Sequence, residues 1–164
     1  MKYFLIFSLF ISFPFISFSQ DEMGVGSDIQ QSESKSLEFS KRDKTLWNFK
    51  LKLSNLITSS PTGVFNKEEI RDYIKELNQI EEDLTQWSEE VDVEQAKLKS
   101  LGVLLDQNKK IQKEIIKVEK KDAQKVKEVK KLIREIGKDE SSVKTLIKKV
   151  QAHKKNISLF KEDK

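Results

Sequence analysis

Residues 70–105 read IRDYIKELNQIEEDLTQWSEEVDVEQAKLKSLGVLL, and every seventh position of this stretch, counted from Ile70, is apolar. This spacing is typical of a coiled-coil helix, in which such side chains form one continuous seam. The positions three residues further on are apolar at four of six steps, which gives a second, broken line beside the seam. The stretch therefore predicts a long packed helix with a seam made of Ile70, Leu77, Leu84, Val91, Leu98 and Leu105.

The first nineteen residues have the composition of a secretory signal peptide. Lys2 precedes an apolar run at positions 4–18, and Ser17 and Ser19 place small residues at positions −3 and −1 of a cleavage site before Gln20. An uncleaved membrane anchor is the alternative, but about 15 residues interrupted by serines and a proline fall short of the roughly 20 that span a bilayer. We expect cleavage between Ser19 and Gln20 and an exported product, either periplasmic or secreted.

Composition favours an all-α domain after this signal. The chain has 164 residues, of which 37% are hydrophobic and 35% charged, and its five glycines and two prolines supply little turn chemistry for a sheet. The absence of cysteine removes disulfides, thiol catalysis and thiolate metal sites. We predict a flexible leader at 20–35, a helical coiled-coil domain at 36–160 with helices at about 36–57, 67–120 and 122–160, and a tail at 161–164.

The boundaries of these helices rest on local signals. Asn66 is placed to cap the second helix after a loop that contains a proline and a glycine. The apolar pattern shifts at residues 120–122, which predicts a kink or a tight turn there, and Gly137 is a second candidate for a break. We therefore expect an elongated antiparallel bundle of three helices, or four if the chain breaks at Gly137. A parallel oligomeric coiled coil is the main alternative.

The first helix carries an apolar face with one polar interruption. Arg42 occupies a position on this face where an apolar residue would complete the spacing, and Trp47 lies beside it. We interpret Trp47 as an aromatic that flanks the core rather than as a ligand platform. The apolar residues of the face are Phe39, Leu46, Phe49, Leu53 and Leu56.

The two halves of the expected mature chain carry opposite charge. Residues 20–105 hold 11 basic and 17 acidic residues, whereas residues 106–164 hold 19 basic and 10 acidic residues. One expectation is that the acidic stretch 76–94 and the basic stretch 109–131 lie side by side in the folded bundle. The other is that the basic stretch binds an anionic surface through Lys109, Lys110, Lys113, Lys117, Lys120, Lys121, Lys127 and Lys131.

The sequence offers no combination of residues typical of a catalytic centre. His153 is the single histidine, and its position on or beside the apolar seam of the last helix favours a packed or half-exposed imidazole over a catalytic one. No phosphate-binding loop or nucleophile motif is present, so we expect no enzyme activity, no metal and no cofactor.

We therefore expect a non-enzymatic coiled-coil protein that binds another protein or itself through helical surfaces. The alternative is a module that binds an anionic membrane or polysaccharide. Nucleic acid is disfavoured as a partner because the basic half contains one arginine and few aromatic side chains to read or stack on bases.

Overall fold

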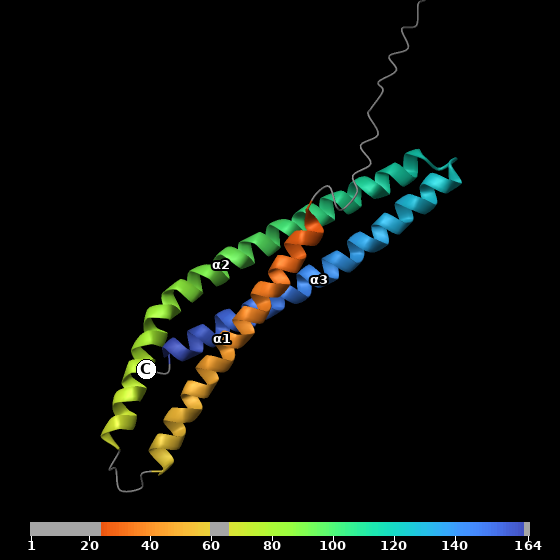
Figure 1. The fold of residues 1–164 in the computed structure, drawn as a ribbon. Coiled ribbons are helices and arrows are strands. Elements are labelled where there is room, and N and C mark those ends of the chain that lie inside the picture. The colour runs from red at the N-terminus through yellow and green to blue at the C-terminus, as the bar shows by residue number, and fades with distance from the viewer. Residues whose placement is uncertain (1–23, 60–65, 163–164) are drawn as a thin grey trace, which may run out of the picture.

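The computed structural model describes residues 24–59 and 66–162, which form three α-helices and no strand (Figure 1). α1 runs Val25–Ser59, α2 runs Lys67–Val118 and α3 runs Ala123–Glu162. The prediction of an all-α, elongated antiparallel bundle is confirmed. The expected signal peptide and its cleavage site lie outside the described residues.

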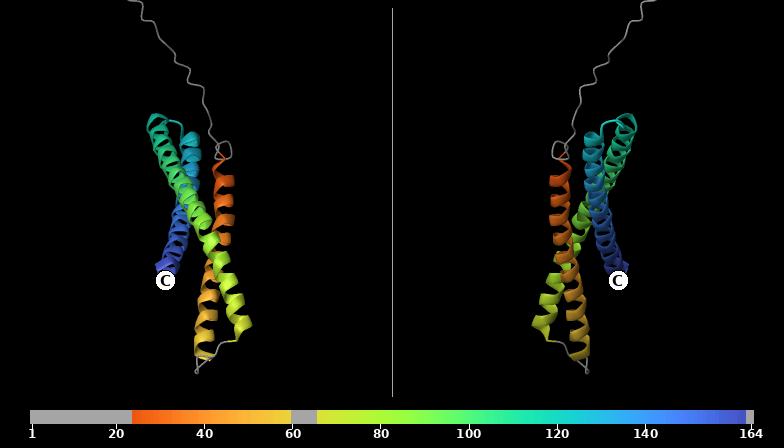
Figure 2. Two further views of the ribbon diagram at one scale, coloured as in Figure 1. Left: turned by 90° about the vertical axis from the view of Figure 1, so that its left-hand side faces the viewer. Right: turned by 90° about the vertical axis from the view of Figure 1, so that its right-hand side faces the viewer.

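The longest helix, α2, is the spine of the bundle. Its 52 residues correspond to about 78 Å at a rise of 1.5 Å per residue. α1 lies antiparallel to it, since ion pairs join Lys52 to Glu76 near one end and Asp28 to Lys97 near the other. α3 also runs antiparallel to α2 and follows it through a short turn. Figure 2 shows α2 running diagonally, close to α1 at its beginning and to α3 at its end.

The apolar core follows the seven-residue spacing of the sequence. Leu84 is 3% exposed, and Val91, Leu98 and Leu105 are completely buried, whereas Ile70 and Leu77 are half-buried near the start of α2. The facing side of α3 repeats the same spacing. Its seam residues are Ile136, Val143, Val150 and Ile157, all of them buried.

Side-chain caps start α2 and α3. The Asn66 side chain accepts a hydrogen bond of 3.0 Å from the backbone N–H of Glu68. The turn predicted at residues 120–122 is present, and Asp122 accepts hydrogen bonds from the N–H groups of Gln124 and Lys125. These caps satisfy backbone donors that a helix start leaves unpaired. α3 continues through Gly137, so the alternative of a fourth helix is not realised.

The flexible leader predicted at 20–35 is wrong from residue 25 onward, because α1 begins at Val25. Val25 and Ile29 are buried, and the next two turns bury Ser32 and Ser36 where apolar residues would be expected. Small side chains at these positions fit a close approach of helices, but they carry no apolar signal. The helical spacing of 25, 29, 32 and 36 therefore does not stand out in the sequence.

Two predictions for the first apolar face also fail. Trp47 is 63% exposed and does not flank the core. Leu53 is 36% exposed, although Phe39, Leu46 and Phe49 are buried as expected. α3 ends at Glu162, before it can cover the last turns of α1, so Leu53 has no third helix over it.

The expected pairing of the acidic and basic stretches is wrong as well. The turn between α2 and α3 falls inside the basic stretch, so its lysines gather at one end of the bundle. The acidic stretch lies instead beside α1 and the end of α3. Its ion pairs across helices join Lys35 and Arg42 to Glu90, Lys52 to Glu76 and Lys154 to Asp92.

Replacing Leu84 by alanine tests whether the seam provides the main stabilisation. We expect Leu84→Ala to lower the free energy of unfolding by about 2–4 kcal/mol, because the cavity left in the core cannot fully collapse. Lys127→Ala on the exposed face of α3 should change it by no more than about 0.5 kcal/mol. Denaturant unfolding followed by circular dichroism measures both, and equal midpoints for the two variants would contradict the seam as the organising core.

Candidate functional site

A charged cluster joins α1 and α2 where the three helices meet. The Arg42 guanidinium is 2.5 Å from a Glu38 oxygen and 3.0 Å from a Glu90 oxygen, and Lys35 lies 3.0 Å from the same Glu90 oxygen. The guanidinium also lies 5.2 Å from the centre of the Trp87 ring, within the range of a cation–π interaction. Arg42 thus stands where the helix face lacks an apolar residue, and its positive charge is paired with two carboxylates.

The environment of Glu90 favours its charged form. Burial raises the pKa of Glu90, but hydrogen bonds from Lys35, Arg42 and Gln86 together outweigh this effect and keep the pKa below its usual value. A carboxylate that accepts from three donors on two helices is held firmly in place. The cluster is therefore a structural connection between α1 and α2.

A second polar contact joins α1 and α3. The His153 ring is 1% exposed, stacks on Phe39 with ring centres 4.8 Å apart, and places Nδ1 2.6 Å from an Asp43 oxygen. The prediction of a packed imidazole is confirmed. Nε2 is buried and has no hydrogen-bond partner within the described part of the chain. Because solvent does not reach the ring, this pair is placed to fix the register of α1 against α3.

Metal-ion clusters and membrane-spanning helices are both absent from the described residues. Among residues 24–59 and 66–162, no three side chains of His, Asp or Glu are grouped to hold a metal ion. In the same ranges, none of the helices combines the length and apolar character needed to cross a bilayer.

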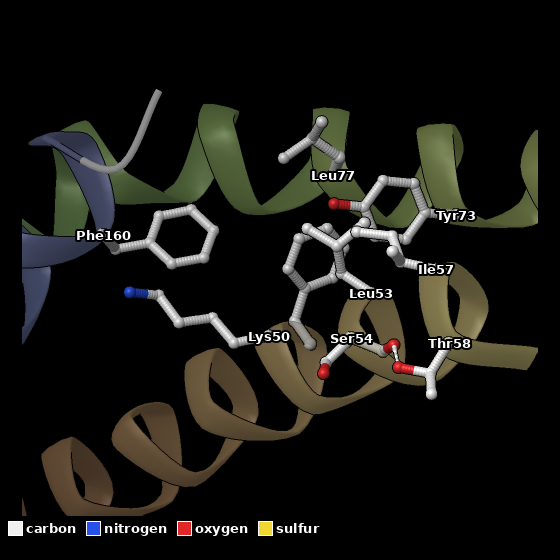
Figure 3. Close-up of a pocket in the computed structure, with 9 residues that line it drawn as sticks. Lys50, Leu53, Ser54, Ile57, Thr58, Tyr73, Leu77 and Phe160 are labelled. Atoms are coloured by element: carbon white, nitrogen blue, oxygen red, sulfur yellow. Dashed lines mark hydrogen bonds between the residues drawn. The ribbon is translucent and has the colours of Figure 1, made fainter.

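An apolar cavity of about 440 Å³ lies between α1 and α2 beyond the end of α3 (Figure 3). Phe49 and Leu53 of α1, Tyr73 and Leu77 of α2 and Phe160 of α3 form its walls. Burial raises the pKa of the Tyr73 hydroxyl. Ligand pockets usually combine apolar walls with several polar groups that converge on one point. The polar side chains in this lining are Lys50, Ser54, Thr58 and Tyr73, and the hydroxyl of Thr58 donates to the backbone oxygen of Ser54. The cavity lies where α3 ends beside the other two helices.

The eight predicted anion-binding lysines all lie around the α2–α3 tip, which we define as residues 104–136. Lys109 is paired with Glu140 of α3 and is therefore part of the helix–helix contact. Lys110 and Lys117 form pairs with acidic residues one turn away on the same helix, at 72% and 64% side-chain exposure. Lys131 is paired in the same way with Glu135 on α3, and its side chain is 79% exposed. Lys113, Lys120, Lys121 and Lys127 are also exposed.

The tip also exposes an apolar line that the sequence analysis missed. Along α2, the seven-residue line that contains Glu76, Glu90 and Lys97 faces α1, as the ion pairs to Lys52, Arg42 and Asp28 show. α1 begins at Val25, beside this last pair, and none of the three described helices covers the remainder of the line. Its continuation consists of Leu104, Ile111 and Val118, which are 54%, 59% and 82% exposed.

A signal for this line was present in the sequence. Leu104, Ile111 and Val118 repeat at seven residues, beside the seam that ends at Leu105. Two adjacent apolar lines on one helix indicate a helix with two packing partners.

Comparison of the chain with protein-family models, curated proteins and solved structures finds no match, so we infer function from this geometry.

The charged cluster at Glu90 predicts a pH dependence of stability. Its lowered pKa provides stability that is present above the unfolded value of about 4.5 and is lost as the pH falls through the lower folded value. We expect Glu90→Gln to lower the free energy of unfolding at pH 7 by about 1–2 kcal/mol. The variant should also lose less further stability than the wild type on acidification below about pH 4.5.

Denaturant unfolding at a series of pH values measures this effect. Glu82→Gln on the exposed face of α2 is the matched control, because it removes a carboxylate outside the cluster. An acid profile of Glu90→Gln that parallels the wild type would contradict a stabilising role for the ionised Glu90.

Proposed function

We propose that this protein is an exported, non-enzymatic helical interaction protein that binds a partner protein through the α2–α3 tip. The observation that carries the proposal is the uncovered apolar line Leu104, Ile111 and Val118. Single exposed apolar residues are ordinary on protein surfaces, but contiguous apolar patches mark interaction sites. Seven-residue spacing makes this line suitable for packing against another helix.

The rest of the bundle has the character of a scaffold. The Arg42–Glu90 and His153–Asp43 contacts connect the three helices in the middle of the molecule. Their polar groups face one another across helix interfaces, which leaves them poorly placed to act on a substrate. The tip, in contrast, extends beyond α1 as two helices (Figures 1 and 2). This arrangement supports binding at the tip rather than catalysis in the bundle.

A second candidate function is binding to an anionic surface such as a phospholipid membrane or a polysaccharide. The observation that favours it is a shallow depression along the outer face of α3 that is rich in cations. Clustered exposed cations attract anionic surfaces, and the attraction weakens with salt. The cations around the depression are Lys120, Lys127, Lys130, Lys131 and Arg134.

Pull-down from the native cell envelope with the immobilised protein tests the first candidate. We expect a protein partner to be recovered by the wild type and by Leu159→Gln, but not by Ile111→Gln. Ile111 lies on the exposed line of the tip, whereas Leu159 is an exposed apolar residue near the other end of α3 and serves as the matched control. Recovery that is unaffected by Ile111→Gln would contradict binding through the tip.

Sedimentation with anionic vesicles tests the second candidate. Salt-sensitive sedimentation that is lost in the triple variant Lys127→Ala, Lys130→Ala, Lys131→Ala, together with no captured protein, would replace the first candidate by the second.

A further inference from the structure

We propose that the partner contributes an acidic amphipathic helix, which packs in the groove between α2 and α3 at the tip and extends the path of α1. This inference rests on the proposed function and deepens it, because it names the structure and the charge of the bound segment. We call this surface the tip groove. It is formed by Leu104, Ile111, Ile115 and Val118 of α2 and by Leu132 of α3.

The first argument is continuity with an interface that the chain already contains. α1 follows the line of α2 from Glu76 to Lys97 through ion pairs and packs mainly on α3, and its first turns bury Val25 and Ile29. Beyond Lys97 this seven-residue line of α2 changes from charged to apolar residues, and no further helix of the described chain covers it. The same groove geometry therefore fits a second helix that follows α1 end to end.

The α3 side of the groove continues in the same way. His153 and Leu146 lie on a seven-residue line of α3 that packs toward α1, as the His153–Asp43 contact shows. The next step along this line is the half-buried Asp139, and the step after it reaches Leu132, which is half-buried at the tip. Across from it, Ile115 of α2 is half-buried as well. Ile115 and Leu132 are thus half-buried at the tip, whereas Leu104, Ile111 and Val118 are exposed. This gradient of exposure is expected of a surface on which one more helix can pack.

The length of the groove defines the bound segment. The fourteen-residue step from Leu104 to Val118 spans about 21 Å, or about four helical turns. A helix that covers this step needs apolar residues at alternating spacings of three and four, because it must face both helices along one stripe. Such a segment is shorter than any of the three helices of the bundle.

The charge of the tip selects an acidic helix. Residues 104–136 contain eleven basic and six acidic residues, a net charge of +5. The exposed ammonium groups of Lys110, Lys117 and Lys131 belong to this basic tip and can exchange their pairs within one helix for pairs with carboxylates of a bound helix. The tip of a second copy would carry the same +5 charge and would be repelled, which disfavours self-association at this surface.

The test uses three synthetic peptides of about 21 residues with helical heptad design. The first has leucines on one face and glutamates elsewhere, the second replaces the glutamates by lysines, and the third keeps the glutamates but replaces the leucines by serines. Fluorescence anisotropy measures their binding to the purified protein. We expect saturable binding of the first peptide, at least tenfold weaker binding of it to Ile111→Gln, unchanged binding to Leu159→Gln, and no saturation with the second and third peptides.

Other results overturn the inference and remain distinguishable from failure of the proposed function. Equal binding of the glutamate–leucine and glutamate–serine peptides would show attraction by charge alone, and equal binding of the glutamate and lysine peptides would remove the charge selection. If no peptide binds but Ile111→Gln still abolishes recovery of the envelope partner, the tip binds a segment of another kind and only the inference fails. If Ile111→Gln changes neither result, the proposed function fails with it.

Discussion

The architecture depends on the apolar seam of α2, a helix that is longer than either of its neighbours. α3 covers α2 from the turn back to the region of Tyr73, and α1 packs mainly on α3 and joins the first half of α2 through ion pairs. All three helices therefore meet in the middle of the bundle. Each end of α2 is then half of a two-helix hairpin. At the α1 end the uncovered space is the cavity bounded by Phe49, Tyr73 and Phe160, and at the α3 end it is the tip groove. Both features follow from the unequal lengths of the helices.

The polar contacts of the middle region fix how the helices are aligned. Apolar seams with a seven-residue repeat can slide by one repeat at moderate cost, because similar side chains then face each other. Asp43 opposite His153 has a single partner position, whereas Glu90 of α2 is held by both Lys35 and Arg42 of α1. A shift of α1 along the bundle would separate Asp43 from the buried His153 ring, and a buried polar group left without its partner is costly. Specific alignment is thus the main contribution of these pairs.

Much of the fold, but little of the candidate site, could be predicted from the sequence. The seam from Leu84 to Leu105, the cap at Asn66 and the turn before Ala123 follow from local spacing and chemistry. The start of α1 was missed because Ser32 and Ser36 hide the helical repeat. The pairing of charges was wrong because it depends on where the chain reverses, and the exposure of Trp47 depends on which face of α1 meets its neighbours. These are tertiary properties that no window of sequence contains.

The tip is the part of the structure in which local stability and binding are most closely linked. Leu105, Gln112 and Ile136 are its buried residues, whereas most of its other apolar side chains are half-buried or exposed. Segments with few buried contacts open more readily than a core. A ligand that binds the ordered form alone stabilises it in proportion to its affinity and concentration. A helix in the tip groove would add the third layer that α1 supplies in the middle of the bundle, so partner binding and ordering of the tip should occur together.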